Sequence, residues 1–218
     1  NSGELSDGDV QWMTAGSGII HQEMPKGNNK GEMHGFQLWA NLPSNQKMTA
    51  PRYQDIKSKE IKSLVEDDGT IIKVIAGNYR GYNGPVDGIA AEPEYLDIYI
   101  PPLKFKKFPF DTRRQGFAYI FEGEGNFHNA SKPVGVKVEK EFQGQEIELR
   151  DLSGNRTLVV FDSGDEVAVQ AGENGVRFLL ISGTPIKEPV AWHGPIVMNS
   201  QEELRQAFNE LNNGTFIK

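Results

Sequence analysis

The sequence predicts an all-β protein made of two related β-units, followed by one helix near the C-terminus. Three observations predict this fold class. Short alternating apolar runs end at glycine or proline, the 24 glycines and 12 prolines are spread along the 218 residues, and one stretch that begins with Gly-Asp occurs twice. Hydrophobic residues make up 37% of the chain, which is enough for a globular core.

The predicted strands follow from period-two alternation. Phe117, Tyr119 and Phe121 share one face of a run that ends at Gly123, because alternate side chains of a strand point to the same side. The same pattern recurs along the chain. We predict strands at residues 70–76, 96–100, 117–121, 157–161, 166–170 and 176–181, with a hairpin turn at residues 67–69.

One helix is predicted close to the C-terminus. Ser200 and Glu203 form a capping box, in which each side chain accepts a hydrogen bond from the other residue's backbone amide. Asn213 and Gly214 end the helical pattern. The apolar positions between them share one face: Leu204, Ala207, Phe208 and Leu211. We expect this amphipathic helix to cover a sheet face or to form a subunit contact.

An internal repeat links the two β-units. Residues 8–16 (GDVQWMTAG) and 164–172 (GDEVAVQAG) share Gly, Asp, Ala and Gly at identical spacing. After one residue of slippage, His21 aligns with Phe178 and Glu23 with Leu180. The first unit therefore carries metal-type ligands where the second carries hydrocarbon, which predicts that one barrel binds a metal while the other is simply packed.

The two copies differ in what precedes them. The second copy follows predicted strands between residues 95 and 127, whereas only seven residues precede Gly8 in the first. We therefore expect the first barrel to be incomplete in this chain, because an open half-barrel exposes apolar edges. An N-terminal segment, another chain or a partner subunit would supply the missing strands.

The pair His21 and Glu23 is the main chemical motif. On a strand these two side chains would converge on one face, and imidazole with carboxylate suits Fe(II) or another divalent first-row metal. Two ligands alone hold such a metal weakly, and the alternative is an exposed pair on a hairpin. Residues 34–39 predict a further strand, on which Gln37 would line a pocket.

The remaining histidines are interpreted as non-catalytic. We expect His34 to make a structural hydrogen bond, His128 to be exposed to solvent, and His193 to lie in a structural turn.

Composition excludes several classes of function. The net charge is -7 with no long basic run, which argues against direct nucleic-acid binding. No apolar run approaches the roughly 18 residues that span a membrane, and no signal peptide opens the chain. The absence of cysteine rules out disulfides, zinc–thiolate sites and thiol catalysis, and fits an intracellular protein. The sequons at Asn129, Asn155 and Asn213 are then interpreted as chance matches.

Four stretches together resemble the pirin family. These are residues 9–16 (DVQWMTAG), 19–25 (IIHQEMP), 35–42 (GFQLWANL) and 193–199 (HGPIVMN), and the resemblance runs from about residue 3 to about residue 212. It implies a bicupin, in which two antiparallel β-barrels face each other. The implied division is residues 1–45 for the second half of the N-terminal barrel, 46–90 for a connection, 91–183 for the C-terminal barrel, and 184–218 for a segment and helix that return to the N-terminal domain.

The resemblance also implies a metal site. Pirins bind iron in the N-terminal barrel through three His and one Glu, of which the last two ligands map onto His21 and Glu23. The first two ligands come from an upstream H-x-H motif that this chain does not contain. The C-terminal barrel of pirins binds no metal, which agrees with Phe178 and Leu180 in the repeat.

Three functional hypotheses follow from the resemblance. The first is a quercetin 2,3-dioxygenase, in which a small aromatic substrate chelates the metal and Glu23 acts as ligand and base. The second is a non-enzymatic regulatory protein that uses the metal or its redox state to bind a protein partner. The third is that the chain as given holds no metal and is inactive. We expect a cytoplasmic protein, or a nuclear one if the source is eukaryotic.

Overall fold

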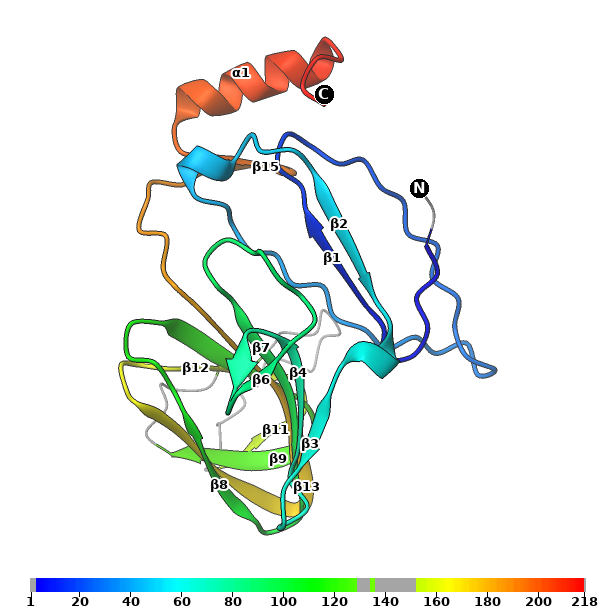
Figure 1. Ribbon diagram of the computed structural model, residues 1–218, viewed down its shortest axis with the longest axis vertical. Coiled ribbons are helices and arrows are strands. Elements are labelled where there is room, and N and C mark those ends of the chain that lie inside the picture. The colour runs from blue at the N-terminus through cyan, green and yellow to red at the C-terminus, as the bar shows by residue number, and fades with distance from the viewer. Residues whose placement is uncertain (1–2, 129–133, 136–151, 218) are drawn as a thin grey trace, which may run out of the picture. The chain divides into compact units, whose positions relative to one another are not determined.

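The computed structural model describes residues 3–128, 134–135 and 152–217 (Figure 1). The sequon residue Asn129 lies outside this part of the chain. The chain divides into two compact units: unit 1 comprises Asn1–Gln11 and Asp55–Pro185, and unit 2 comprises Trp12–Gln54 and Ile186–Lys218. Unit 1 is mostly sheet, whereas unit 2 contains one α-helix, a short hairpin and a long segment without regular structure.

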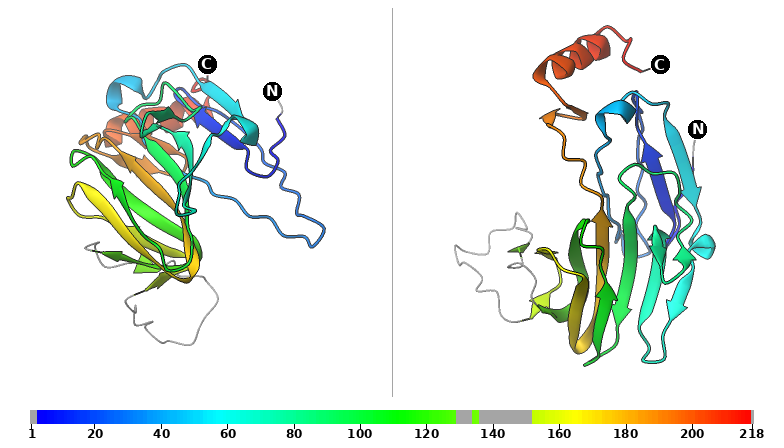
Figure 2. Two further views of the ribbon diagram at one scale, coloured as in Figure 1. Left: turned by 60° about the horizontal axis from the view of Figure 1, so that its bottom comes forward. Right: turned by 60° about the vertical axis from the view of Figure 1, so that its left-hand side comes forward.

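Unit 1 is built on a nine-stranded antiparallel sheet that curls on itself (Figure 2). The strand order is β10-β12-β9-β13-β7-β4-β3, while β8 pairs with β13 and β11 pairs with β9. The strands are β3 (Ser63–Val65), β4 (Ile71–Ala76), β7 (Glu94–Ile100), β8 (Phe105–Pro109), β9 (Gln115–His128), β10 (Val134–Gly135), β11 (Ser153–Gly154), β12 (Thr157–Val160) and β13 (Glu166–Gly183). These elements include a strand at each of the places predicted from alternation: residues 70–76, 96–100, 117–121, 157–161, 166–170 and 176–181.

The central strand β13 differs from expectation. Two strands were predicted at residues 166–170 and 176–181, but one strand of 18 residues covers both. A register shift between Ala171 and Val176 absorbs the intervening glycines as a bulge instead of a turn. At that bulge, a Cβ on Gly123 would lie 2.1 Å from the Gly175 carbonyl oxygen, so only glycine fits there.

The interior of unit 1 is filled with hydrocarbon. Phe108 and Phe178 are fully buried and meet edge to face at 6.1 Å, and Phe127 lies 5.1 Å from Phe178. Alternating residues of the strands complete this core: Ile72, Val74, Leu96, Ile98, Ile100, Ala118, Ile120, Val159, Val167, Val169, Val176 and Leu180. Phe178 and Leu180, the apolar counterparts of His21 and Glu23 in the repeat, both lie in this core.

Unit 2 contains the predicted helix, α1 (Gln201–Asn212), beside the hairpin of β14 (Ala191–His193) and β15 (Ile196–Met198). The capping box is confirmed, because the Glu203 amide donates to Ser200 Oγ at 3.2 Å and the Ser200 amide donates to Glu203 Oε2 at 2.9 Å. A small core joins helix and hairpin: Ala191, Ile196, Met198, Leu204, Ala207 and Phe216, with Phe208 and Leu211 at its edge.

Four short strands and two 3₁₀ helices complete the elements of the described residues. Strand β1 (Val10–Thr14) pairs with β2 (Arg52–Ile56), and β5 (Asn78–Tyr79) pairs with β6 (Tyr82–Asn83). Two short 3₁₀ helices lie at Ser44–Gln46 and Ser58–Glu60. Among the described residues, no helix has the length and apolar character needed to cross a membrane.

The segment of residues 15–43 contains no helix or strand, which corrects the strand expected around His21 and Glu23 and the strand predicted at residues 34–39. Apolar alternation stabilises a strand only when neighbouring strands supply backbone hydrogen bonds and a face to pack against. No strand of the described chain pairs with this segment. Its apolar side chains are therefore left exposed: Ile20, Met24, Met33, Phe36 and Trp39.

Candidate metal centre

His21 and Glu23 lie next to each other in the irregular segment of unit 2. His21 Nδ1 is 3.7 Å from Glu23 Oε1, and the two side chains are 44% and 64% exposed. An i, i+2 spacing in an extended chain places both side chains on one side, so the pair converges even though no strand is formed. The structure thus brings together the two residues that the H-x-E motif singles out.

The donor set fits a divalent metal in kind but is incomplete in number. An imidazole nitrogen and a carboxylate oxygen suit Fe(II) and similar ions, for which three or more protein ligands are usual. Among the residues that the structure describes, no group of three or more His, Cys, Asp or Glu side chains gathers into a metal site. His21 and Glu23 can therefore supply two ligands, and other donors would have to complete the coordination.

Gln37, the predicted pocket residue, lies in the same irregular segment and is exposed. Because residues 34–39 form no strand, the shared strand face on which its role was predicted is absent from the structure. The assignments of Gln37 to the pocket and of Glu23 to catalysis remain predictions.

The other three histidines contact aromatic rings. The rings of His34 and Phe36 lie 5.1 Å apart, those of His128 and Phe105 5.8 Å apart, and those of His193 and Phe208 5.3 Å apart. His128 is exposed as predicted, and His193 is the last residue of strand β14, directly before the turn at Gly194 and Pro195.

Sequence reasoning missed an ionic cluster on unit 1. The Lys106 ammonium lies between the carboxylates of Glu66 and Asp68, and Arg80 Nη1 donates to Glu66 Oε1 at 2.7 Å. The hydrogen bond from Lys106 is the main cause that lowers the Asp68 pKa to about 2. These residues come from separate parts of the chain, so no local motif could have indicated the cluster.

A second polar cluster holds unit 2 together. Lys47 is buried and donates to Asn41 Oδ1 at 2.8 Å, while Glu188 accepts from the Ser44 amide at 2.7 Å and from Asn199 Nδ2 at 2.9 Å. Burial lowers the pKa of Lys47, and the charge of Glu188 opposes that shift. The cluster ties the 3₁₀ turn at residues 44–46 to the start of α1, which is a structural role.

The curled antiparallel sheet with a hydrocarbon interior is typical of cupin proteins. The Pirin family model matches residues 1–40, and the model of the Pirin C-terminal cupin domain matches residues 95–217. The chain therefore belongs to the pirin family. This confirms the predicted family and the cupin-type, mostly β fold with a C-terminal helix.

Similar proteins agree with this assignment. A pirin-like protein of Caulobacter vibrioides is 38% identical over 98% of this chain and 70% of its own length. A Thermoplasma acidophilum protein named putative quercetin 2,3-dioxygenase Ta0133 is 32% identical over 99% of this chain and 81% of its own length. The crystal structure of quercetin 2,3-dioxygenase from Acinetobacter baumannii superposes with a TM-score of 0.74 at 27% identity, covering 96% of this chain and 67% of that one.

Proposed function

We propose that the protein containing this chain is a metal-dependent dioxygenase of the quercetin 2,3-dioxygenase type, acting on a flavonol or a related aromatic. The observation that carries the proposal is the contact between His21 and Glu23 at 3.7 Å, within the stretch that matches the Pirin model. The names of the Thermoplasma relative and of the Acinetobacter structure support the same reaction.

Fe(II) or another divalent first-row ion, held by His21, Glu23 and further donors, would supply Lewis-acid polarisation of the bound substrate. The chain's own residues have separate tasks. Glu23 accepts the proton of the flavonol hydroxyl as general base, and His21 fixes the position at which that oxygen binds. The Gln37 amide, in the same segment, donates to or accepts from a substrate hydroxyl. The exposure of His21 and Glu23 leaves a path for a planar substrate.

A flavonol ring-cleavage assay tests this proposal. The natural protein, loaded with Fe(II) and supplied with O2, should bleach the flavonol absorbance and release the cleaved ester together with one carbon monoxide, and Glu23→Gln should abolish turnover. Glu32→Gln is a matched control, because Glu32 is an exposed carboxylate of the same segment that accepts from Asn28 Nδ2. A lack of product at high protein concentration, with stoichiometric iron bound, contradicts the proposal.

A second candidate function is regulatory binding of a protein partner. The apolar residues that flank the pair favour it, since Ile20 is 83% exposed and Met24 is 80% exposed. Exposed apolar residues that cluster on a surface mark protein contacts. This reading predicts that Ile20→Ser with Met24→Ser abolishes partner capture while iron content is unchanged. If wild type turns over a flavonol and the double variant does so at the same rate, the dioxygenase function is favoured.

A further inference from the structure

The segment that carries the candidate metal pair is held at both ends by contacts inside unit 2. Before the pair, the Ser17 amide donates to the Thr49 carbonyl at 2.9 Å, and Ser17 is buried. After the pair, Asn41 Oδ1 accepts from Lys47 Nζ at 2.8 Å. Because Lys47 and Thr49 are only two residues apart, these contacts bring the two ends of the segment together. Between the two ends, residues 20–37 are exposed.

The Phe216 ring packs against the first of these two ends, at Gly18. A Cβ on Gly18 would lie 3.4 Å from Cδ1 and Cε1 of Phe216 and 3.0 Å from Cγ1 of Ile217. Phe216 is itself buried, in the small core between α1 and the β14–β15 hairpin. Gly18 has a φ of +119°, so glycine permits both this backbone conformation and the close approach of the ring. A residue of the core of unit 2 therefore fixes the backbone three residues before His21.

A fixed backbone before the pair matters because two ligands hold a divalent metal weakly and must meet it together with further donors. Exposed side chains on an unpacked backbone lose conformational entropy when metal binding orders them. Packing at Gly18 removes part of this loss, since the chain that leads into the pair is ordered before the metal arrives. Three residues span at most about 11 Å, so the contact at Gly18 also limits where His21 can lie.

We propose that Phe216 is a positioning residue for the metal centre at His21 and Glu23. Its ring holds Gly18 in place, and through Gly18 it holds the backbone that leads into the pair. Both ligands then bind the metal with a smaller loss of conformational freedom. Phe216 acts only through this backbone and is not itself a ligand. The inference rests on the metal centre of the proposed function, but it does not depend on the dioxygenase reaction.

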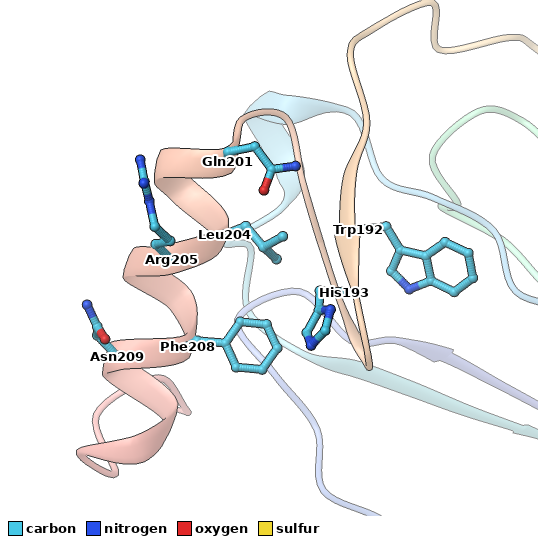
Figure 3. Close-up of a pocket in the computed structure, with 7 residues that line it drawn as sticks. All are labelled: Trp192, His193, Gln201, Leu204, Arg205, Phe208 and Asn209. Atoms are coloured by element: carbon cyan, nitrogen blue, oxygen red, sulfur yellow. The ribbon is translucent and has the colours of Figure 1, made fainter.

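Calorimetric titration of the metal-free natural protein with Co²⁺ tests the proposal. Phe216→Ala should weaken Co²⁺ binding about three- to tenfold, less than the roughly 10–100-fold loss that follows removal of a direct partner of a ligand. Phe216→Leu keeps a buried apolar side chain and should restore most of the affinity. Phe208→Ala is the matched control, because Phe208 packs at the edge of the same core, where its ring faces His193 at 5.3 Å (Figure 3). It should destabilise unit 2 but leave the dissociation constant within about twofold of wild type.

A substitution at Gly18 tests the same contact from its other side. Gly18→Ala places a methyl group against Phe216 and Ile217 and should also weaken Co²⁺ binding by about threefold or more. Gly31→Ala is the matched control in the same segment. Gly31 also has a positive φ, +76°, but a Cβ there would meet nothing within 4 Å among the described residues. Gly31→Ala should leave the affinity within about twofold of wild type.

The outcomes separate this inference from the metal centre itself. If Phe216→Ala weakens Co²⁺ binding no more than Phe208→Ala does, or if Gly18→Ala and Gly31→Ala have equal effects, the positioning role is overturned while the metal centre stands. If the wild-type protein binds no Co²⁺, both the metal centre and the positioning role are wrong.

Discussion

Phe178 and His21 occupy aligned positions of the internal repeat, yet their surroundings are opposite. Phe178 is fully buried on β13, where β7 and β9 pair on either side and Phe108 and Phe127 pack against its ring. His21 is 44% exposed beside Glu23, in a segment that pairs with no strand among the described residues. The difference teaches that neighbouring strands, more than the repeat pattern itself, decide whether a β-unit is buried.

The largest expected effect concerns Phe178, the buried member of this pair. Phe178→Ala should lower the free energy of unfolding of unit 1 by about 3–5 kcal/mol, because the cavity cannot refill among Phe108, Phe127 and Leu180. His21→Ala should change that free energy by less than about 0.5 kcal/mol, as an exposed site does. Urea unfolding followed by circular dichroism measures both, and similar losses for the two variants would contradict the contrast.

A pH-dependent effect should mark the Gly-Asp turn of the first repeat copy, at Gly8 and Asp9. Asp9 accepts from the amides of Ser58 at 2.8 Å and Ser6 at 3.1 Å and from Lys57 Nζ at 3.2 Å, and the Ser58 amide is the main cause that lowers the Asp9 pKa from 3.8 to about 2. A carboxyl whose pKa is lower in the folded state stabilises the fold above its unfolded pKa and loses this effect as the pH falls.

Asp9→Asn should therefore reduce the melting temperature at neutral pH, and the difference from wild type should shrink between about pH 4 and about pH 2. Asp7→Asn, at an exposed neighbour, serves as the control and should have little effect at either pH. A difference that persists unchanged at the lowest pH would show that the charge of Asp9 is not what stabilises this turn.

The helix cap tests unit 2 separately from unit 1. Ser200→Ala removes the acceptor of the Glu203 amide and should cost about 1 kcal/mol. Hydrogen exchange of the α1 amides should rise while that of the β13 amides stays constant. Equal acceleration in both units would mean that they unfold together.

The smallest expected effect concerns a polar atom inside unit 1. The Tyr79 hydroxyl is buried and has no hydrogen-bond partner within the part of the chain that is described, and its ring lies 6.3 Å from that of Phe108. A buried hydroxyl that makes no hydrogen bond costs free energy, so Tyr79→Phe should be neutral or should stabilise by up to about 1 kcal/mol. A clear loss in thermal stability would reveal a partner, such as a bound water.

The sequence predicted most of unit 1 and the helix of unit 2, because both depend on local patterns. Alternation identified residues 117–121 within β9, and the Ser200–Glu203 capping box located the start of α1. Prediction from local patterns failed where the secondary structure depends on residues that are distant in the sequence. The residues around His21 and Glu23 have a strand pattern, but no described strand pairs with them. Strand β13 continues through glycines that indicate a turn when read locally.

The candidate site shows the same limit. The spacing of His21 and Glu23 was enough to predict that their side chains would meet, since i and i+2 lie on one side of an extended chain. The Glu66–Lys106–Asp68 cluster was missed because Lys106 meets the two carboxylates only through tertiary packing.

The most direct test of the central claim is a Co²⁺ titration of the chain, followed through paramagnetic effects on its backbone amide signals. The account predicts that the amides around His21 and Glu23 broaden first, that those of β13 around Phe178 and Leu180 remain sharp, and that His21→Ala removes the effect. Broadening centred on His34, His128 or His193, or an effect that survives His21→Ala, would contradict the assignment of the metal chemistry to this pair.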